Sequence, residues 1–259
     1  MDMLTELTAK IDIFLIVLAR VSGIFVAAPL FSNRAVPRQV KIGLTFIIAL
    51  IIYTARLPEA GRLPSGVTAY TLLLTGELII GLVIGFVAQL VFAAVTLAGQ
   101  MLDFQMGFSI VNVIDPLNLT QVPLVGSFKN ILALLVFLAT NGHHYLLAAL
   151  YRSFDLIPLF GFQGKTTMVE AILDMFGTMF VTGIKIAIPV VGAIFVAEVA
   201  MGIIARTVPQ MNVFIVGIPA KIFVGLAVMI MVIPLYTGFL TVLFERNFAD
   251  IIRLLKIMG

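Results

Sequence analysis

The sequence predicts an all-α integral membrane protein, and three observations support that fold class. Of its 259 residues, 61% are apolar and only 11% are charged, whereas soluble domains are about 45 to 50% apolar and about 25% charged. The mean hydropathy is +1.18. The apolar residues form long stretches without the alternation of a β-strand, so each stretch is predicted to be a helix.

Composition also excludes several classes of function. The chain contains no Cys, which excludes disulfides, thiol catalysis and zinc sites built from Cys. The net charge is only +3, and the basic residues are dispersed, so no nucleic-acid-binding patch is predicted. The segment 1–11 lacks a basic region ahead of its apolar neighbour, so we expect no cleaved signal peptide.

The lengths of the apolar stretches do not match a row of simple membrane spans. Predicted helices cover residues 11–31, 40–55, 67–102, 130–151, 171–205 and 211–244. The first and fourth have the roughly 20 residues that cross a hydrocarbon core about 30 Å thick. The third, fifth and sixth would each exceed about 50 Å as continuous helices with a rise of 1.5 Å per residue.

Helix-breaking residues inside the three longest stretches predict bent helices or hairpins. They are Gly76, Gly81, Gly85, Pro189, Gly192, Gly217, Pro219, Gly225 and Pro234. Broken helices at membrane depth are tolerated only where protein or a water-filled cavity covers the freed backbone groups. The spacing of Gly81 and Gly85 also lets another helix backbone approach closely.

Charged side chains fall well inside the apolar stretches. These are Arg20, Glu77, Lys185, Glu198 and Lys221. A charge at the bilayer centre costs at least about 2.5 to 3.5 kcal/mol. We therefore predict that these side chains are shielded from lipid by protein, by each other or by water.

Polar residues also form a stripe on the third stretch. Gln89, Thr96, Gln100 and Asp103 fall within about 60° of one helix face at 100° per residue. Two interpretations are open: the stripe lines a pore or cavity, or it makes hydrogen bonds between helices that are worth about 1 kcal/mol each.

The tandem pair His143 and His144 raises the possibility of a metal or proton-transfer site. Two metal-binding His on one helix need i, i+4 spacing, which adjacent residues do not have. Ser109 has no base near it in the sequence, and no nucleophile–base pair is evident elsewhere. We favour a structural role for the His pair and predict no enzymatic activity, no cofactor and no metal site.

Short strings of recognisable residues recur along the chain. They are Arg20-x-x-Gly23, Ala28 to Ser32, Arg34-x-Val36-Pro37, Lys41-Ile42, Gln105 to Phe108, Asn112, Asp115-Pro116, Asn141 to His144, Ala205 to Phe214 and Gly217-x-Pro219-x-Lys221. Together these strings resemble the FliR family of flagellar biosynthesis proteins, in order and over nearly the whole chain. The Asn141-Gly-His-His string favours the flagellar branch over the virulence-secretion relatives.

This resemblance implies an export gate for type III protein secretion. In the family, one copy joins several FliP and FliQ subunits in a helical assembly at the flagellar basal body in the bacterial inner membrane, with FlhB associated and an FlhA ring beneath. Unfolded flagellar proteins are its export substrates. The resemblance also implies a FliP-like half at about 1–150 and a FliQ-like half at about 171–259.

The resemblance further assigns a pore plug within the connection 103–129, which is long, apolar and interrupted by Gly and Pro. Such connections are more often functional than solvated linkers. If the segment is a plug, Gln89, Gln100 and Asp103 would line the way to it. A structural re-entrant loop is the alternative. The plug segment comprises Gln105, Met106, Gly107, Phe108, Ser109, Ile110, Val111, Asn112, Val113, Ile114, Asp115 and Pro116.

A rival prediction from another class is a secondary transporter of a small solute. It would use broken helices, with Glu77, Lys185 or Glu198 as the coupling group. An intramembrane metal enzyme at His143 and His144 is a weaker rival.

Overall fold

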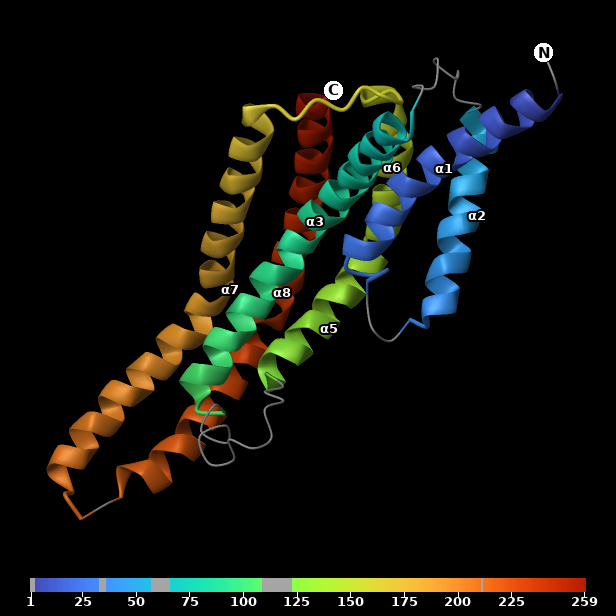
Figure 1. Ribbon diagram of the computed structural model, residues 1–259. Helices are drawn as coiled ribbons and strands as arrows, with labels where there is room; N and C mark the ends of the chain where they lie inside the picture. The colour runs from blue at the N-terminus through green and yellow to red at the C-terminus, as the bar shows by residue number, and fades with distance from the viewer. Residues whose placement is uncertain (1–2, 33–35, 57–65, 109–122, 211) are drawn as a thin grey trace. The chain divides into compact units, whose positions relative to one another are not determined.

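The computed structural model describes residues 3–32, 36–56, 66–108, 123–210 and 212–259. Within these ranges the chain is helical and no strand is present (Figure 1). The all-α fold class is therefore confirmed. The helices are α1 (Met3–Ala27), α2 (Arg38–Arg56), α3 (Val67–Met106), α5 (Leu124–Ala139), α6 (Gly142–Leu156), α7 (Thr166–Thr207) and α8 (Val213–Met258).

The three longest helices are continuous over their assigned ranges, so no hairpin forms inside them, whereas the predicted bending of these helices stays a prediction. α3 has 40 residues, α7 has 42 and α8 has 46. Pro189 lies inside α7, and Pro219 and Pro234 lie inside α8. A single Pro removes one backbone hydrogen bond but leaves the helical bonds on either side in place, so the helix continues through it.

The stretch 130–151 was predicted to be one helix of the length of a membrane span, and the structure corrects the single helix. The structure divides it between α5 and α6, which are separated by Thr140 and Asn141. Asn141 has φ of 56° and ψ of 30°, which is the left-handed region that Asn and Gly enter most readily. The break therefore occurs at the Asn-Gly pair that precedes the two His residues.

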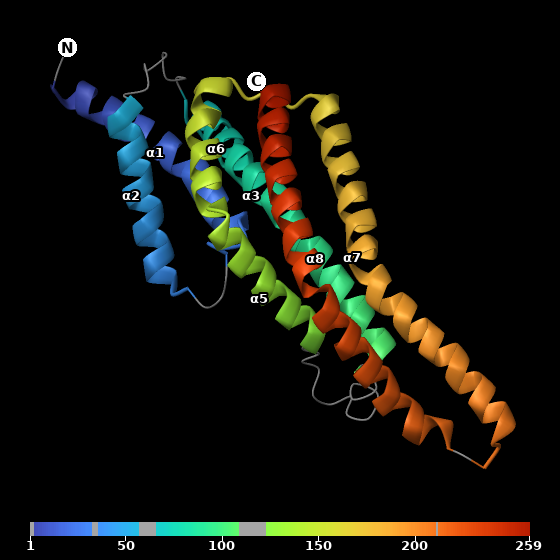
Figure 2. The same ribbon diagram turned by 180° about the vertical axis from the view of Figure 1, so that it is seen from behind.

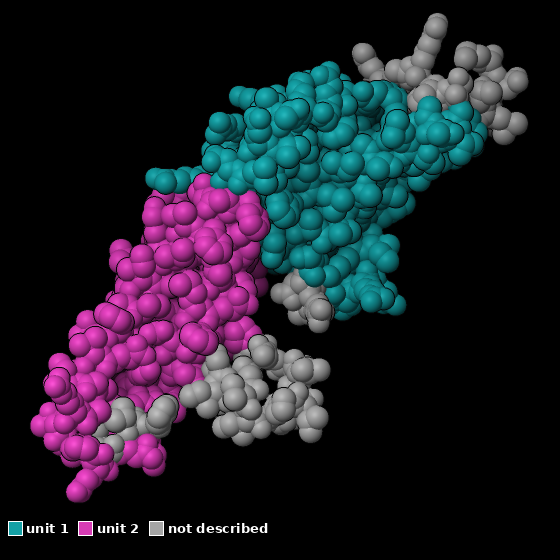
Figure 3. Space-filling view, turned by 60° about the vertical axis from the view of Figure 1, so that its left-hand side comes forward, with its two compact units in different colours: residues 1–90, 141–175, 244–259 teal, residues 91–140, 176–243 magenta. Residues whose placement is uncertain are grey.

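The chain forms two compact units, each assembled from separate segments. Unit 1 comprises residues 1–90, 141–175 and 244–259, and unit 2 comprises residues 91–140 and 176–243. Figure 3 shows unit 1 in teal and unit 2 in magenta. Because α3, α7 and α8 each contribute to both units, the long helices supply part of each core.

In unit 1, α1 packs against the first part of α3 and against α2, and α6 lies beside the last part of α8 (Figures 1 and 2). The Tyr145 and Phe248 rings stack with centroids 4.9 Å apart. The Asn247 side-chain amide donates to the Val87 carbonyl at 2.8 Å. The fully buried core includes Ile16, Val21, Ile24, Ile80, Leu146 and Leu150.

In unit 2, the last part of α3 and α5 pack with the parts of α7 and α8 that lie within residues 176–243. The Phe92 and Phe137 rings meet edge to face at 5.8 Å. The tight approach of α7 to α3 depends on Gly183, because a Cβ there would lie 2.8 Å from Leu97 Cδ2. The buried core includes Val95, Leu102, Ala133, Ala187, Ile194 and Leu240.

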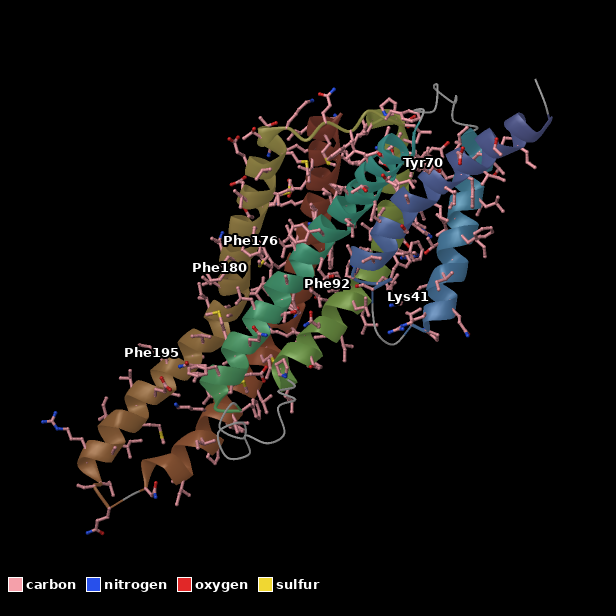
Figure 4. All side chains as sticks on the ribbon, in the orientation of Figure 1. Lys41, Tyr70, Phe92, Phe176, Phe180 and Phe195 are labelled. Atoms are coloured by element: carbon pink, nitrogen blue, oxygen red, sulfur yellow. The ribbon has the colours of Figure 1, made fainter. Side chains whose placement is uncertain are left out.

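Within the part of the chain that the structure describes, four helices are long and apolar enough to cross a membrane, or up to five spans are present if α5 and α6 together form one. Their most apolar windows are 61% buried in α3 but only 17% in α2, 22% in α7 and 11% in α8. On α7, Phe176, Phe180 and Phe195 are at least half exposed (Figure 4). Much of the apolar surface is therefore available to lipid or to other chains.

Candidate functional site

The most deeply buried polar group in unit 1 is an ion pair between α1 and α3. Arg20 is 0% exposed and Glu77 is 2% exposed, and Arg20 Nε donates to Glu77 Oε2 at 2.6 Å. Arg20 Nη1 donates to the Ser153 hydroxyl at 3.2 Å, and Nη2 donates to the Ile157 carbonyl at 3.0 Å. The guanidinium carbon also lies 4.1 Å from the centre of the Phe154 ring.

This arrangement explains how a charge is accommodated inside an apolar bundle. Each nitrogen of the guanidinium donates a hydrogen bond, and the carboxylate balances its charge, which are the conditions under which a buried ion pair offsets its desolvation. Because the partners come from α1, α3 and the end of α6, Arg20 links three segments of unit 1.

In unit 2, the C-terminal end of α3 is fixed by its own backbone. Gly107 has φ of 88°, and its N–H donates to the Phe104 carbonyl at 3.1 Å. The Phe108 N–H donates to the Asp103 carbonyl at 3.0 Å. This pair of bonds is the Schellman motif, in which Gly supplies the left-handed residue. The helix therefore ends at Met106, the second residue of the predicted plug segment.

The side chain of Asp103 ties α3 to the start of α5. It is 5% exposed, and its two oxygens accept hydrogen bonds from the Val125 N–H at 2.9 Å and the Gly126 N–H at 3.0 Å. The N-cap residue of α5, Pro123, makes no side-chain cap. Asp103 therefore supplies the missing cap and places a negative charge at the positive end of the helix dipole.

A second polar cluster joins the end of α3 to α7 and α8 within unit 2. Lys221 of α8 forms an ion pair with Glu198 of α7, and their side chains are 28% and 34% exposed. The Gln105 side-chain amide donates to the other oxygen of Glu198 at 3.2 Å. Next to it, the buried Met106 packs on Gly225 of α8, where a Cβ would lie 2.8 Å from Met106 Cε.

The two ends of the connection between α3 and α5 are therefore held by different contacts. Where the connection leaves α3, Gln105 and Met106 contact α7 and α8. Where it reaches α5, the first backbone N–H groups of α5 bind the Asp103 side chain of α3. Gln105 to Phe108 are described by the structure, and the rest of the predicted plug, 109–116, lies outside the described residues. Hydrogen bonds of the Gln105 and Asp103 side chains contribute to the contacts at the two ends.

The remaining residues of the predicted polar stripe have different environments. Thr96 accepts a hydrogen bond from the Asn130 side-chain amide of α5 at 2.9 Å. Gln100 is exposed, and Gln89, which belongs to unit 1, has a buried Oε1 without a partner in the described part of the chain. Thr96 and Asp103 thus make contacts between helices, as one of the two interpretations expected.

The remaining predicted charge, Lys185, is exposed on α7. The sequence interpretation missed Lys129, which is only 4% exposed and places its amine 4.6 Å from the centre of the Tyr236 ring. In the sequence Lys129 ends the connection 103–129 and borders the apolar stretch 130–151, so its burial is not predicted. In the structure α5 begins at Leu124, so Lys129 lies inside that helix, on its buried side.

The His143 and His144 rings lie 4.2 Å apart and are tilted by 51°. His143 Nδ1 is buried without a hydrogen-bond partner among the described residues. In the same part of the chain, no group of three or more His, Cys, Asp or Glu side chains is arranged to hold a metal ion. The pair is therefore a ring contact at the first turn of α6.

Comparison with known proteins identifies the family. The model of the family described as bacterial export proteins, family 1, matches residues 11–247. The flagellar biosynthetic protein FliR of Bacillus subtilis is 39% identical over 250 residues, which cover 95% of each chain. FliR of Escherichia coli is 32% identical over 244 residues, covering 93% of each chain. FliR of Aquifex aeolicus is 26% identical over 259 residues, covering 99% of this chain and 96% of its own.

The match to the family spans both compact units and includes every residue of the Arg20, Asp103 and Glu198 clusters. Together with the long apolar helices, it indicates a membrane location and a role in flagellar export. The chain therefore belongs to bacterial export protein family 1 and, within that family, to the FliR group of flagellar biosynthetic proteins.

Proposed function

We propose that this chain is a core structural subunit of the flagellar type III export gate. With FliP and FliQ subunits it would form the channel through which unfolded flagellar proteins cross the bacterial inner membrane at the basal body. One copy would be present per gate, with FlhB and FlhA as neighbours. Its role is that of a channel wall, and no enzymatic step is assigned to it.

The observation that carries this proposal is the exposed apolar surface on helices longer than a bilayer. At about 1.5 Å per residue, α7 and α8 are each more than about 60 Å long, whereas the hydrocarbon core is about 30 Å thick. Only 22% and 11% of their most apolar windows are buried by this chain. Apolar surface beyond the membrane needs a protein partner, because water does not stabilise it.

We propose that the segment from Gln105 to Pro116 plugs the closed channel. The contacts at its two ends support this role, because Gln105 and Asp103 fix where the segment leaves α3 and where it returns to α5. The FliP-like half at about 1–150 and the FliQ-like half at about 171–259 belong to the same proposal. In the helical assembly, these two halves would occupy neighbouring positions.

The subunit composition of the native complex tests the proposed assembly. A tagged chain extracted in mild detergent is expected to copurify with several FliP and FliQ subunits for each copy of itself, because the exposed faces of α7 and α8 are covered only in the complex. Native mass spectrometry measures the ratio. A well-behaved monomer that takes up a small solute in proteoliposomes would instead support a secondary transporter.

Ion conductance tests the plug separately. Replacing residues 109–114 with Gly and Ser is expected to make membranes that contain the complex leak small ions at rest, because the apolar side chains that fill the constriction are removed. The matched control is the same replacement at residues 57–62, in a different connection. If the complex assembles normally and conductance stays at the control level, the segment is a structural loop and not a plug.

A further inference from the structure

An open pocket lies between α1 and α2 in unit 1. Its volume is about 460 Å³, which falls within the range of roughly 300 to 1,000 Å³ found for small-molecule sites. The walls are mostly apolar and come from Leu18, Phe25 and Val26 on α1 and from Ile42 and Phe46 on α2. Val26, Ile42 and Phe46 are at least half exposed, so the pocket opens onto the surface of this unit.

One cation and three hydroxyl groups complete the pocket. Lys41 and Thr45 of α2 line it together with Ser22 of α1 and Ser32, which follows α1. The Thr45 hydroxyl donates to the Lys41 carbonyl at 2.7 Å. Among the described residues no carboxylate forms an ion pair with Lys41. The Ser22 hydroxyl donates to the Ala19 carbonyl at 2.8 Å, which leaves its oxygen free to accept. The pocket thus combines an apolar interior with a positive charge that no described residue of unit 1 neutralises.

The position of Lys41 along its helix sets the expected membrane depth. α2 has 19 residues, so it is about 28 Å long and matches a hydrocarbon core about 30 Å thick. Lys41 lies in the first turn of α2, near its N-terminal end (Figure 4). At that level a Lys ammonium reaches the headgroup layer while its carbon chain lies along apolar surface.

We propose that this pocket binds an anionic phospholipid. One acyl chain occupies the apolar cleft between α1 and α2, and the phosphate accepts hydrogen bonds from the Lys41 ammonium and the Ser32 hydroxyl. A soluble anion would leave the apolar walls uncovered, and an uncharged apolar helix would leave Lys41 without a counter-charge. A phospholipid satisfies both parts of the pocket. The proposal requires only the membrane location and goes beyond the role in export.

Photolabelling of the full complex tests the site. The probe is phosphatidylglycerol with a diazirine on one acyl chain, used in vesicles of equal parts phosphatidylethanolamine and phosphatidylglycerol. Labels mapped by mass spectrometry are expected on the segments 18–26 and 41–46. Unlabelled phosphatidylglycerol is expected to compete for the site, whereas inorganic phosphate and diacylglycerol are not, because each supplies only half of the ligand.

Variants of Lys41 identify the charge that matters. The Lys41→Gln variant is expected to reduce labelling by about fivefold, the effect of one Lys at an anionic membrane surface, and Lys41→Arg is expected to retain it. The matched control is Arg38→Gln, because Arg38 lies in the same turn of α2 but is exposed and does not line the pocket. This control is expected to leave the labelling of both segments unchanged.

Three results would overturn the proposal. Equal labelling by zwitterionic and anionic probes would show that the charge plays no part in binding. Equal losses for Lys41→Gln and Arg38→Gln would indicate general attraction to the surface instead of a built site. Absence of label from both segments in a correctly assembled complex would show that a neighbouring subunit fills the pocket.

Discussion

Replacing Arg20 with Met is expected to abolish folding of most of the protein. The substitution leaves the Glu77 carboxylate only 2% exposed and without its cation, and removing one partner of a buried ion pair costs about 3 to 5 kcal/mol. That cost is a large part of the roughly 5 to 15 kcal/mol by which a typical domain is stable. The measurement is the amount of tagged chain that resists protease in membranes, together with the denaturation midpoint of the purified complex.

The double variant with Met at both Arg20 and Glu77 separates the lost charge partner from the lost packing. Replacing a whole buried ion pair by apolar side chains is often nearly neutral, so the double variant is expected to recover much of the stability that the single variant loses. Recovery will be incomplete, because Ser153 and the Ile157 carbonyl also lose their donor. If the double variant is as unstable as the single one, the ion pair is not the source of the effect.

The sequence identified the buried charges but not their partners. Arg20 and Glu77 stood out because lipid does not tolerate a central charge. Their pairing joins residues 57 positions apart, and no rule of local spacing connects such positions. The same holds for Asp103, which was placed on a polar stripe by helical periodicity. Periodicity shows which face of a helix carries polar groups. Which residues that face contacts depends on the tertiary fold.

Apolar composition predicted where most helices lie but not where they end. α1 begins at Met3, ahead of the predicted start at residue 11, and α8 continues to Met258, beyond the predicted end at residue 244. The apolar stretches located α1, α2, α3, α7 and α8. The division of α5 from α6 was missed because apolar residues continue on both sides of Asn141, and hydropathy carries no information about φ. The Asn-Gly pair was the available signal, since both residues readily adopt left-handed conformations.

Hairpins within α7 and α8 were predicted in part from Pro residues that the structure accommodates within continuous helices. Pro189, Pro219 and Pro234 are exposed, so each removes one backbone hydrogen bond without placing its ring in a packed core. Glycine was the better guide at Gly81 and Gly85, where close approach of another backbone was predicted and is confirmed.

Among Gly→Ala substitutions in unit 1, Gly81→Ala is expected to be the most destabilising. A Cβ at Gly81 would overlap the Arg20 carbonyl oxygen and would lie 3.0 Å from Gly23 Cα. These atoms are backbone, so no rotamer change relieves the clash. Overpacking costs about 1 to 3 kcal/mol and sometimes more, and here α1 must move away from α3. The denaturation midpoint of the purified complex measures the loss.

The matched control is Gly43→Ala on α2. A Cβ at Gly43 meets no atom within 4 Å, and Ala is favoured over Gly in a helix by roughly 0.5 to 1 kcal/mol, so this variant is expected to be neutral or slightly more stable. Equal losses in both variants would indicate that helix flexibility matters and not the close approach of α1 to α3.

The two expected losses are linked, because the carbonyl that blocks a methyl group at Gly81 belongs to Arg20 itself. Moving α1 away from α3 also draws the guanidinium away from Glu77. Arg20→Met is therefore expected to cost less in a Gly81→Ala background than in the native chain, as contacting residues show in double-mutant cycles. Strict additivity would mean that α1 keeps its place and that the new methyl group is absorbed elsewhere. Non-additivity would show that one close contact between α1 and α3 holds both the glycine packing and the buried ion pair.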